Sequence, residues 1–298
     1  MSVPREVIPG RFYMLTRRCT QRQFLLRPDE ATNNSFIYCL ADAARRFRID
    51  VILPVVLSNH HHTIVFDRCG TIVEFTEHLH KFVAKAQNAL RGRWENLWSS
   101  EPPCLVHLVD PADVVTKLTY AATNPVKDHL VERAHQWPGV NGLSALLADR
   151  PLTVRRPRHF FRANGPMPHS VSIRFVIPPE LGDPEEVRRE LRGRVAAVER
   201  QAALERRQSG QAVVGRRGVL RQAWRSQPLT GAPHRGLRPR VAAQNKWARV
   251  AALLRNRAFV AAYNDARSRW LQGLPVAFPP GTYWLRRFAN VPVLPFVA

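Results

Sequence analysis

The fold of this chain is decided by the stretch DVILPVVLSNHHHTIVF, residues 50–66. Residues 50–57 form an apolar run of strand length, Ser58-Asn59 has turn chemistry, and residues 60–66 are typical of a returning strand. The stretch therefore predicts a β-hairpin. Pro54 cannot donate a hydrogen bond to a neighbouring strand, so we expect the first strand at a sheet edge or beside a bulge.

Elements predicted on both sides of this hairpin complete an α+β fold. Residues 11–19 alternate as a strand does, and residues 105–109 are a further strand candidate. Apolar residues recur at helical spacing over 31–48 and 71–91. Asp110-Pro111 then predicts the start of another helix, which we expect to end near Asn124 because Pro125 follows. The order β-α-β-β-α-β-α indicates a small antiparallel sheet backed by two helices.

The second half of the chain is predicted to be mainly helical. Residues 136–168 are rich in Pro, Gly and Arg and are expected to form a connector, followed by a strand at 170–177. We expect a long charged helix from Asp183-Pro184 to about 208, a loop over 209–240, a helix over 241–271 and a Pro-rich tail. We therefore divide the chain into residues 1–148 and a helical extension, residues 149–298.

The two halves differ strongly in charge. Residues 1–150 hold 18 Lys and Arg against 15 Asp and Glu, a net charge of +3, whereas residues 151–298 hold 27 against 8, a net charge of +19. Only five of the 45 basic residues are lysine, so a codon bias towards Arg is an alternative explanation. Such a bias does not explain why the acidic residues halve. The asymmetry favours a nucleic-acid partner for the second half.

The sequence predicts a protein of the reducing cytoplasm. No apolar run approaches the ~18 residues of a membrane span, and the N-terminus lacks the pattern of a signal peptide. The four cysteines are widely spaced, and we expect them to be buried free thiols.

A candidate metal site begins with the histidines of the returning strand. Side chains two apart in a strand share a face, so His60 and His62 project together while His61 points the other way. Two neutral imidazoles provide half of a divalent-metal site. The pattern His-x-His also arises by chance, and a polar surface strand or a histidine satisfied in the core is the alternative.

A candidate nucleophile lies on the helix that starts at Pro111. Tyr120 and Asn124 are four residues apart and share a polar face near Lys117. A phenol has a free pKa of ~10, so it attacks a phosphodiester only when a metal polarises the phosphate. His60, His62 and the amide oxygen of Asn124 could hold that metal, and the product would be a covalent phosphotyrosine. The alternative is a partly exposed tyrosine with no catalytic role.

Three motifs in this order resemble the single-tyrosine HUH transposases, and in particular REP-associated tyrosine transposases and relatives of insertion-sequence transposases. The motifs are Asn59-His60-His61-His62, then Tyr120-x-x-x-Asn124-Pro125-Val126, then LVERAHQWPG at 130–139, and the resemblance covers roughly residues 5–145. This chain departs from the family at His61, where a bulky hydrophobic residue is usual, and in its long extension.

The resemblance implies a ferredoxin-like antiparallel sheet with helices on one face, the HUH palm. It implies that His60, His62 and Asn124 bind Mg²⁺ or Mn²⁺ and that Tyr120 becomes joined to a 5′ phosphate. The implied activity is a metal-dependent single-strand DNA endonuclease and strand transferase that cleaves near a DNA hairpin. The implied setting is the bacterial nucleoid, with single-stranded DNA or hairpins as partners and a homodimer as one possible state.

The extension alternates arginines with aromatic residues, which suits unpaired DNA because arginines neutralise phosphates and rings stack on bases. The alternative is that Trp224, Trp247, Trp270 and Trp284 form the core of a helical subdomain. The residues that we expect to bind DNA are Lys117, Lys127, Arg221, Arg225, Arg235, Arg238, Arg240 and Lys246.

Two other functions compete with the transposase-like enzyme. One is a domesticated DNA-binding protein that recognises a sequence or hairpin but no longer transposes. The other is a histidine-triad nucleotide hydrolase, which would need a third histidine at position 64. That position is Ile64, so we set this function aside.

Overall fold

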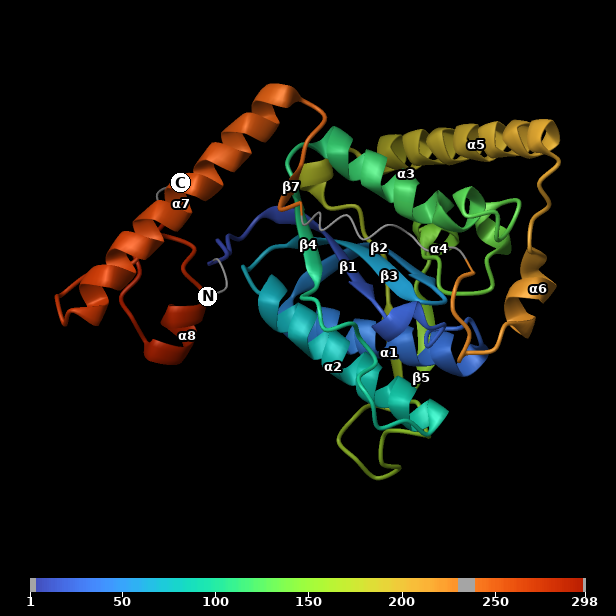
Figure 1. Cartoon of the computed structure of the whole chain (residues 1–298), viewed down its shortest axis with the longest axis horizontal. Helices are drawn as coiled ribbons and strands as arrows, with labels where there is room; N and C mark the ends of the chain where they lie inside the picture. The colour runs from blue at the N-terminus through green and yellow to red at the C-terminus, as the bar shows by residue number, and fades with distance from the viewer. Residues whose placement is uncertain (1–3, 230–238, 297–298) are drawn as a thin grey trace.

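A five-stranded, mostly antiparallel sheet lies at the centre of the protein (Figure 1). The computed structural model describes residues 4–229 and 239–296. The strand order is β2-β3-β1-β4-β7, and the chain enters it as β-α-β-β-α-β, which is ferredoxin-like. The first seven strands and α-helices are β1 Arg11–Arg18, α1 Glu30–Phe47, β2 Ile49–Leu57, β3 His60–Asp67, α2 Ile72–Arg91, β4 Cys104–Leu108 and α3 Pro111–Lys127. The α+β fold predicted from the sequence is therefore confirmed.

Helices cover both faces of the sheet. His61 contacts Phe36 of α1 and His80 of α2, so these two helices back the face on which His61 lies. On the opposite face Asn124 of α3 contacts His62. The two backing helices match the prediction, and α3 adds a layer on the face that the prediction left without a helix. Helix α5, Pro184–Ser209, runs alongside α3 farther from the sheet (Figure 1).

The hairpin of β2 and β3 forms as predicted. The two strands pair antiparallel from Ile49↔Asp67 to Leu57↔His60, and the register shifts between Val51 and Leu53. The bulge therefore lies at Ile52, two residues before Pro54, and β2 is an edge strand, as expected for a proline that cannot donate to the ladder.

Helix α3 continues past the residue at which we predicted its end. Pro125 lies inside the helix, which runs to Lys127. A proline at this position lacks the N–H that would bond to the carbonyl four residues earlier. Pro125 and Val126 are buried, and Asn141 Nδ2 donates to the neighbouring carbonyl of Ala122 at 3.1 Å. Tertiary packing thus outweighs the local cost of the proline.

The predicted connector at 136–168 is in part a structural element of the sheet edge, so that prediction is wrong. The Val56 N–H donates to the Val140 carbonyl at 2.8 Å, and Gly142 N–H donates to the Pro54 carbonyl at 2.9 Å. Trp137 is buried and its Nε1 donates to the Val56 carbonyl at 2.8 Å. These contacts cover the edge of β2, which would otherwise expose unpaired backbone groups.

The remaining elements belong mostly to the helical extension. They are α4 Leu143–Leu147, β5 Leu152–Arg155, β6 Ser170–Ile173, α6 Gly215–Arg221, β7 Val241–Ala242, α7 Lys246–Leu271 and α8 Trp284–Ala289, with short 3₁₀ turns at Thr20–Arg22, Ala134–Gln136 and Pro179–Leu181.

Helix α5 starts directly after the Asp183 N-cap, as predicted. The predicted strand at 170–177 is shorter, the predicted loop contains α6, and the predicted last long helix begins only at Lys246 because residues 241 and 242 pair with β4.

One hydrophobic cluster crosses the boundary that we predict between residues 148 and 149. It joins the sheet to Phe175, Leu191 and Val195 of the extension. A second, small cluster surrounds Phe278 beneath α7. Figure 1 shows α7 and α8 lying to one side of the sheet, beyond β4 and β7. The first part of the extension therefore shares the main core.

Among the described helices, none is long and apolar enough to cross a membrane. The described cysteines form no disulfide: Cys19 and Cys39 are buried, as expected, but Cys69 is exposed and Cys104 is half-buried. The expectation that all four are buried is wrong for these two.

Candidate active site

A cleft of about 930 Å³ opens where β3 begins, where β1 ends and where α3 approaches its last turn. Its wall includes His60, Tyr120, Asn124 and Lys127, which the sequence singled out from two separate motifs. The fold therefore brings the histidine motif and the tyrosine motif to one place.

His60 and His62 both present Nε2 as an unprotonated nitrogen. The Nδ1 of His60 lies 2.7 Å from Asn59 Oδ1, which only accepts, so this nitrogen carries the proton. The Nδ1 of His62 lies 2.7 Å from Thr16 Oγ1 of the paired strand, and Asn124 Nδ2 donates to its Nε2 at 3.2 Å. The two ring centroids are 4.9 Å apart. Such outer partners fix the tautomer of metal-binding histidines.

The electrostatic surroundings keep both rings neutral. Burial lowers the pKa of His62 to about 4, and the positive charges of Arg18 and Lys117 add to this effect. Burial and then His62 hold the pKa of His60 well below its ordinary value. Neutral imidazole is the form that binds a metal ion, so both rings are in that form near pH 7.

Asn124 completes a donor set with the two histidines. It is 6% exposed and its amide faces His62. Half a turn of the carboxamide would present Oδ1 in place of Nδ2 without moving the helix. Among residues 4–229 and 239–296, no three or more His, Cys, Asp or Glu side chains form a metal-binding group. The candidate donors here are two imidazoles and one amide.

Tyr120 lies on the open side of this set. Its ring is 40% exposed and meets the His62 ring edge-on at a centroid distance of 5.7 Å. The ammonium groups of Lys117 and Lys127 lie 5.6 and 5.7 Å from the ring centroid. Burial and then Asp128 raise the pKa of the Tyr120 hydroxyl, so the phenol is protonated at neutral pH. A nucleophilic role thus requires a phosphate that is itself activated.

His61 points away from the cleft, as predicted. It is fully buried, and its Nε2 lies 2.9 Å from Nε2 of His80 while its Nδ1 lies 3.0 Å from Thr63 Oγ1. Arg17 Nη1 donates to His80 Nδ1 at 3.2 Å. Because a guanidinium only donates, His80 must donate from Nε2 to His61, and His61 must donate from Nδ1 to Thr63. This side of the motif is a closed hydrogen-bond chain.

The predicted DNA-binding residues fall into three groups. Lys117 and Lys127 flank Tyr120, and Arg221 and Arg225 lie beside Gln222 and Ser226, which line the cleft. Arg240 and Lys246 are not among the residues that line the cleft, since they lie near β7 at the other end of the sheet. Arg235 and Arg238 lie outside the described residues.

The aromatic residues of the extension also separate. Trp224 packs against the main core, between the guanidinium groups of Arg225 and Arg93 at 4.7 and 5.8 Å from its ring centroid. Trp247 is 73% exposed, and Trp270 and Trp284 are also exposed. The alternative of a tryptophan core is therefore wrong for these three.

Sequence reasoning missed several residues of the cleft. Arg18 lies at the end of β1, Asp128 one turn beyond Asn124, and Gln211, Val214 and Gln222 come from the extension. The spacing of Tyr120, Asn124 and Asp128, at four-residue steps on one helix, was a signal for Asp128. Nothing in the local sequence shows that residues 211–229 fold back onto the site.

Two transposases are among the solved structures that resemble this chain, both at low similarity. Neither protein-family models nor curated protein sequences match the chain. A REP-associated tyrosine transposase bound to a REP hairpin is 18% identical with a TM-score of 0.42, over 54% of this chain and 88% of that one. A candidate transposase from Deinococcus radiodurans R1 is 17% identical with a TM-score of 0.28, over 36% of this chain and 85% of that one. At this level of similarity the two structures do not indicate the function of this chain.

Proposed function

We propose that this protein is a metal-dependent single-strand DNA endonuclease and strand transferase of the HUH transposase type, acting near a DNA hairpin through a 5′-phosphotyrosine. The observation that carries the proposal is the convergence of Tyr120, Asn124 and His60 in the wall of one cleft, with His62 directly behind them in contact with Asn124 and Tyr120. This convergence joins residues from β3 and α3 that are about sixty positions apart in the sequence.

His60, His62 and Asn124 fit a divalent cation. The donor set of two imidazoles and an amide oxygen suits Mn²⁺ better than Mg²⁺, which prefers oxygen ligands throughout. A divalent ion held there would polarise the scissile phosphate and stabilise the negative charge that develops on it during attack. Because the Tyr120 pKa is raised, this activation has to act on the phosphate side of the reaction.

The chain's own residues then supply position and charge. Lys117 and Lys127 lie close to the Tyr120 ring and would hold a phosphate beside the hydroxyl. The Tyr120 oxygen forms a bond to phosphorus, the bond from phosphorus to the 3′ oxygen breaks, and that oxygen leaves as a 3′-OH after taking a proton. The phenol proton passes to solvent. The phosphotyrosine keeps the bond energy, so the reverse reaction rejoins a strand without ATP.

The test is a search for the covalent intermediate. The full chain is incubated with 5′- or 3′-labelled hairpin oligonucleotides carrying single-stranded flanks, in Mg²⁺, Mn²⁺ or EDTA, and run on denaturing gels beside Tyr120→Phe. We expect a metal-dependent adduct that retains the 5′ phosphate side and that Tyr120→Phe abolishes. The matched control is Tyr263→Phe, a tyrosine on α7 outside the cleft.

Two outcomes would contradict the proposal. An adduct that persists in Tyr120→Phe would place the nucleophile elsewhere. Tight hairpin binding without an adduct in either metal would favour a DNA-binding protein that has lost the cleavage activity.

A further inference from the structure

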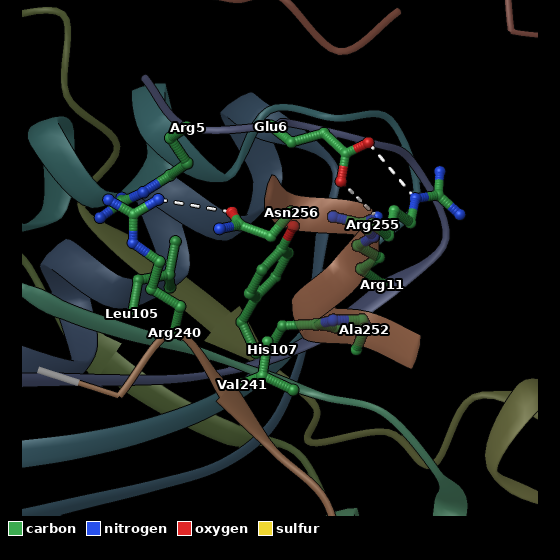
Figure 2. Close-up of a pocket in the computed structure, with 11 residues that line it drawn as sticks. Arg5, Glu6, Arg11, Leu105, His107, Arg240, Val241, Ala252, Arg255 and Asn256 are labelled. Atoms are coloured by element: carbon green, nitrogen blue, oxygen red, sulfur yellow. Dashed lines mark hydrogen bonds and ion pairs between the residues drawn. The ribbon is translucent and has the colours of Figure 1, made fainter. Parts of the chain in front are cut away.

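A second, smaller cavity lies at the other end of the sheet from the cleft, between the N-terminal segment, β1, β4, β7 and α7 (Figure 2). Its volume is about 110 Å³. This space accommodates waters or one small ion and is smaller than the ≈300–1,000 Å³ typical of sites for larger organic ligands.

Positive charge dominates the lining of this cavity. Arg5, Arg11, Arg240 and Arg255 line it, and Glu6 is the one carboxylate among its described lining residues. Both oxygens of Glu6 are already used: Arg11 Nη2 donates to one at 2.8 Å, and Arg255 Nε donates to the other at 3.3 Å.

Arg5 and Arg240 are the two positively charged lining residues that do not pair with Glu6. Among the described residues neither forms an ion pair, and Arg240 Nη1 meets only the amide oxygen of Asn256, at 3.4 Å. Figure 2 shows Arg5 and Arg240 on one side of the cavity and Glu6 with Arg255 on the other. Two guanidinium groups brought together without a counter-charge repel each other, and a bound anion would relieve this repulsion.

The backbone also holds this arrangement in place. Val241 of β7 pairs with His107 of β4, and the His107 N–H donates to the Arg240 carbonyl at 2.9 Å. The Val7 N–H donates to the Gly281 carbonyl at 3.0 Å, which ties the N-terminal segment to the extension beside Arg5. Arg5 and Arg240 are therefore positioned by ordered backbone.

We propose that Arg5 and Arg240 bind one phosphate group, and that this phosphate belongs to the backbone of a nucleic acid. A guanidinium fork matches the geometry of phosphate oxygens, and the cavity is large enough for one such group. The assignment to nucleic acid rests on the proposed function and on the charge of α7, which carries Lys246, Arg249, Arg255, Arg257, Arg267 and Arg269 against the single acid Asp265.

The geometry of α7 extends the site. Ala252 and Asn256 line the cavity, and Arg249 lies three residues before Ala252, on the same side of the helix. Trp247, at the start of this helix, is exposed and carries the Lys246 ammonium 5.6 Å from its ring centroid. A nucleic-acid strand with one phosphate bound to Arg5 and Arg240 would thus continue along a basic helix that has an exposed aromatic ring at its start.

The experiment measures DNA binding by the full chain in EDTA, where no cleavage occurs. Fluorescence anisotropy with a labelled hairpin gives Kd between 50 and 200 mM NaCl, conditions chosen because phosphate contacts are salt-dependent. We compare wild type, Arg5→Gln/Arg240→Gln, and the control Arg46→Gln/Arg192→Gln, which removes two exposed arginines from α1 and α5 outside both cavities. Calorimetry with inorganic phosphate tests the other source of the anion.

We expect Arg5→Gln/Arg240→Gln to raise Kd about tenfold and to lower the slope of log K against log[salt] by about 0.9, because the two arginines neutralise one phosphate of duplex DNA, with little change in the control. An unchanged slope, or an equal change in the control, would overturn the proposal. Inorganic phosphate binding that needs Arg5 and Arg240, with unchanged DNA affinity, would also overturn the nucleic-acid assignment.

The covalent adduct separates this proposal from the proposed function. If Arg5→Gln/Arg240→Gln binds DNA as wild type does and still forms the Tyr120 adduct, the phosphate site is refuted and the strand transferase stands. If neither wild type nor the variant forms an adduct but DNA binding depends on Arg5 and Arg240, the phosphate site stands and the strand transferase is refuted.

Discussion

On one face of β3, His60 and His62 present unprotonated nitrogens beside a cleft of about 930 Å³, whereas on the other face His61 is sealed between α1 and α2. The three residues are identical and consecutive. Their difference arises from the alternation of the strand and from the partners of each Nδ1 and Nε2 atom. On the cleft face the Nδ1 partner of His60 leaves its Nε2 as an acceptor, and the Nε2 of His62 accepts only from the amide of Asn124, which can rotate. On the core face the chain from Arg17 to Thr63 occupies every ring nitrogen.

This comparison shows that a histidine is a candidate ligand where its Nε2 is unprotonated and is held by no fixed donor of the core. Burial depresses the pKa on both faces, to about 4 for His62 and to about 3 for His61. A lowered pKa therefore does not distinguish the two roles. The hydrogen-bond partners do distinguish the two roles, because they show which neutral rings are held on both nitrogens by fixed partners of the core.

The largest effect is expected on the cleft face. His60→Ala and His62→Ala should each lower the rate of adduct formation by about 10²- to 10³-fold, because each removes one ligand of the proposed ion. Single-turnover kinetics in Mn²⁺ measure this rate, and His135→Ala, an exposed histidine outside the cleft, is the control. A rate within threefold of wild type would remove the histidine pair from the mechanism.

His61 should affect stability instead. His61→Leu leaves the buried Nε2–H of His80 without an acceptor, which should lower the free energy of unfolding by about 1–3 kcal/mol. His61→Leu/His80→Leu removes both partners and should recover more than half of that loss. Urea denaturation measures the free energy, and adduct formation should stay near wild type in the double variant. Additive losses in the double variant would show that the two rings do not depend on each other.

Two double lysine variants, one on each face of the sheet, test whether DNA binding depends on the cleft. Lys117→Gln/Lys127→Gln should weaken single-stranded DNA binding about tenfold and lower the salt slope by about 1.4, or 0.7 for each contact. Lys81→Gln/Lys85→Gln removes the same charge from exposed positions of α2, on the His61 side of the sheet, and should leave binding nearly unchanged. Equal losses in the two variants would mean that binding follows net charge and not the cleft.

The parts of this site that the sequence predicted are those set by local periodicity. Alternation separated His61 from its neighbours, and four-residue spacing put Tyr120 and Asn124 together. The orientation of the Asn124 amide and the Thr16 partner of His62 depend on strand register and on packing between distant elements, which no short window of sequence contains.

The errors in the predicted fold have the same origin. Pro125 predicted a helix end, but burial of Pro125 and Val126 keeps that turn helical. The Pro- and Gly-rich composition around residue 140 predicted a connector, yet Val140 and Gly142 satisfy the backbone of β2. Composition describes what a segment prefers in isolation, and here an exposed sheet edge decides its structure instead.

The smallest effect is expected from His107, which lies on the same face of the sheet as His61 but at its open edge. Its ring is tilted by 50° against the Tyr13 ring, at a centroid distance of 5.9 Å. Burial, then Arg11 and Arg255, lower the pKa of His107 to about 4, against an unfolded value near 6.5. The folded ring stays neutral where the unfolded ring takes up a proton. Its contribution to stability is therefore fully present above pH 6.5 and is lost as the pH falls towards 4.

His107→Phe keeps a ring against Tyr13 and removes this titration. Wild type should lose about 1 kcal/mol more of its free energy of unfolding between pH 7 and pH 5 than His107→Phe does, a figure reduced for the partial solvent access of the ring. Glu6 pairs with Arg11 and Arg255 and reduces their charge at His107, so burial is the main cause of the lowered pKa. Denaturation curves at the two pH values measure the difference. Parallel losses in the two proteins would show that the open edge leaves His107 as well solvated as the unfolded chain, and that only the sealed part of this face keeps its histidines neutral.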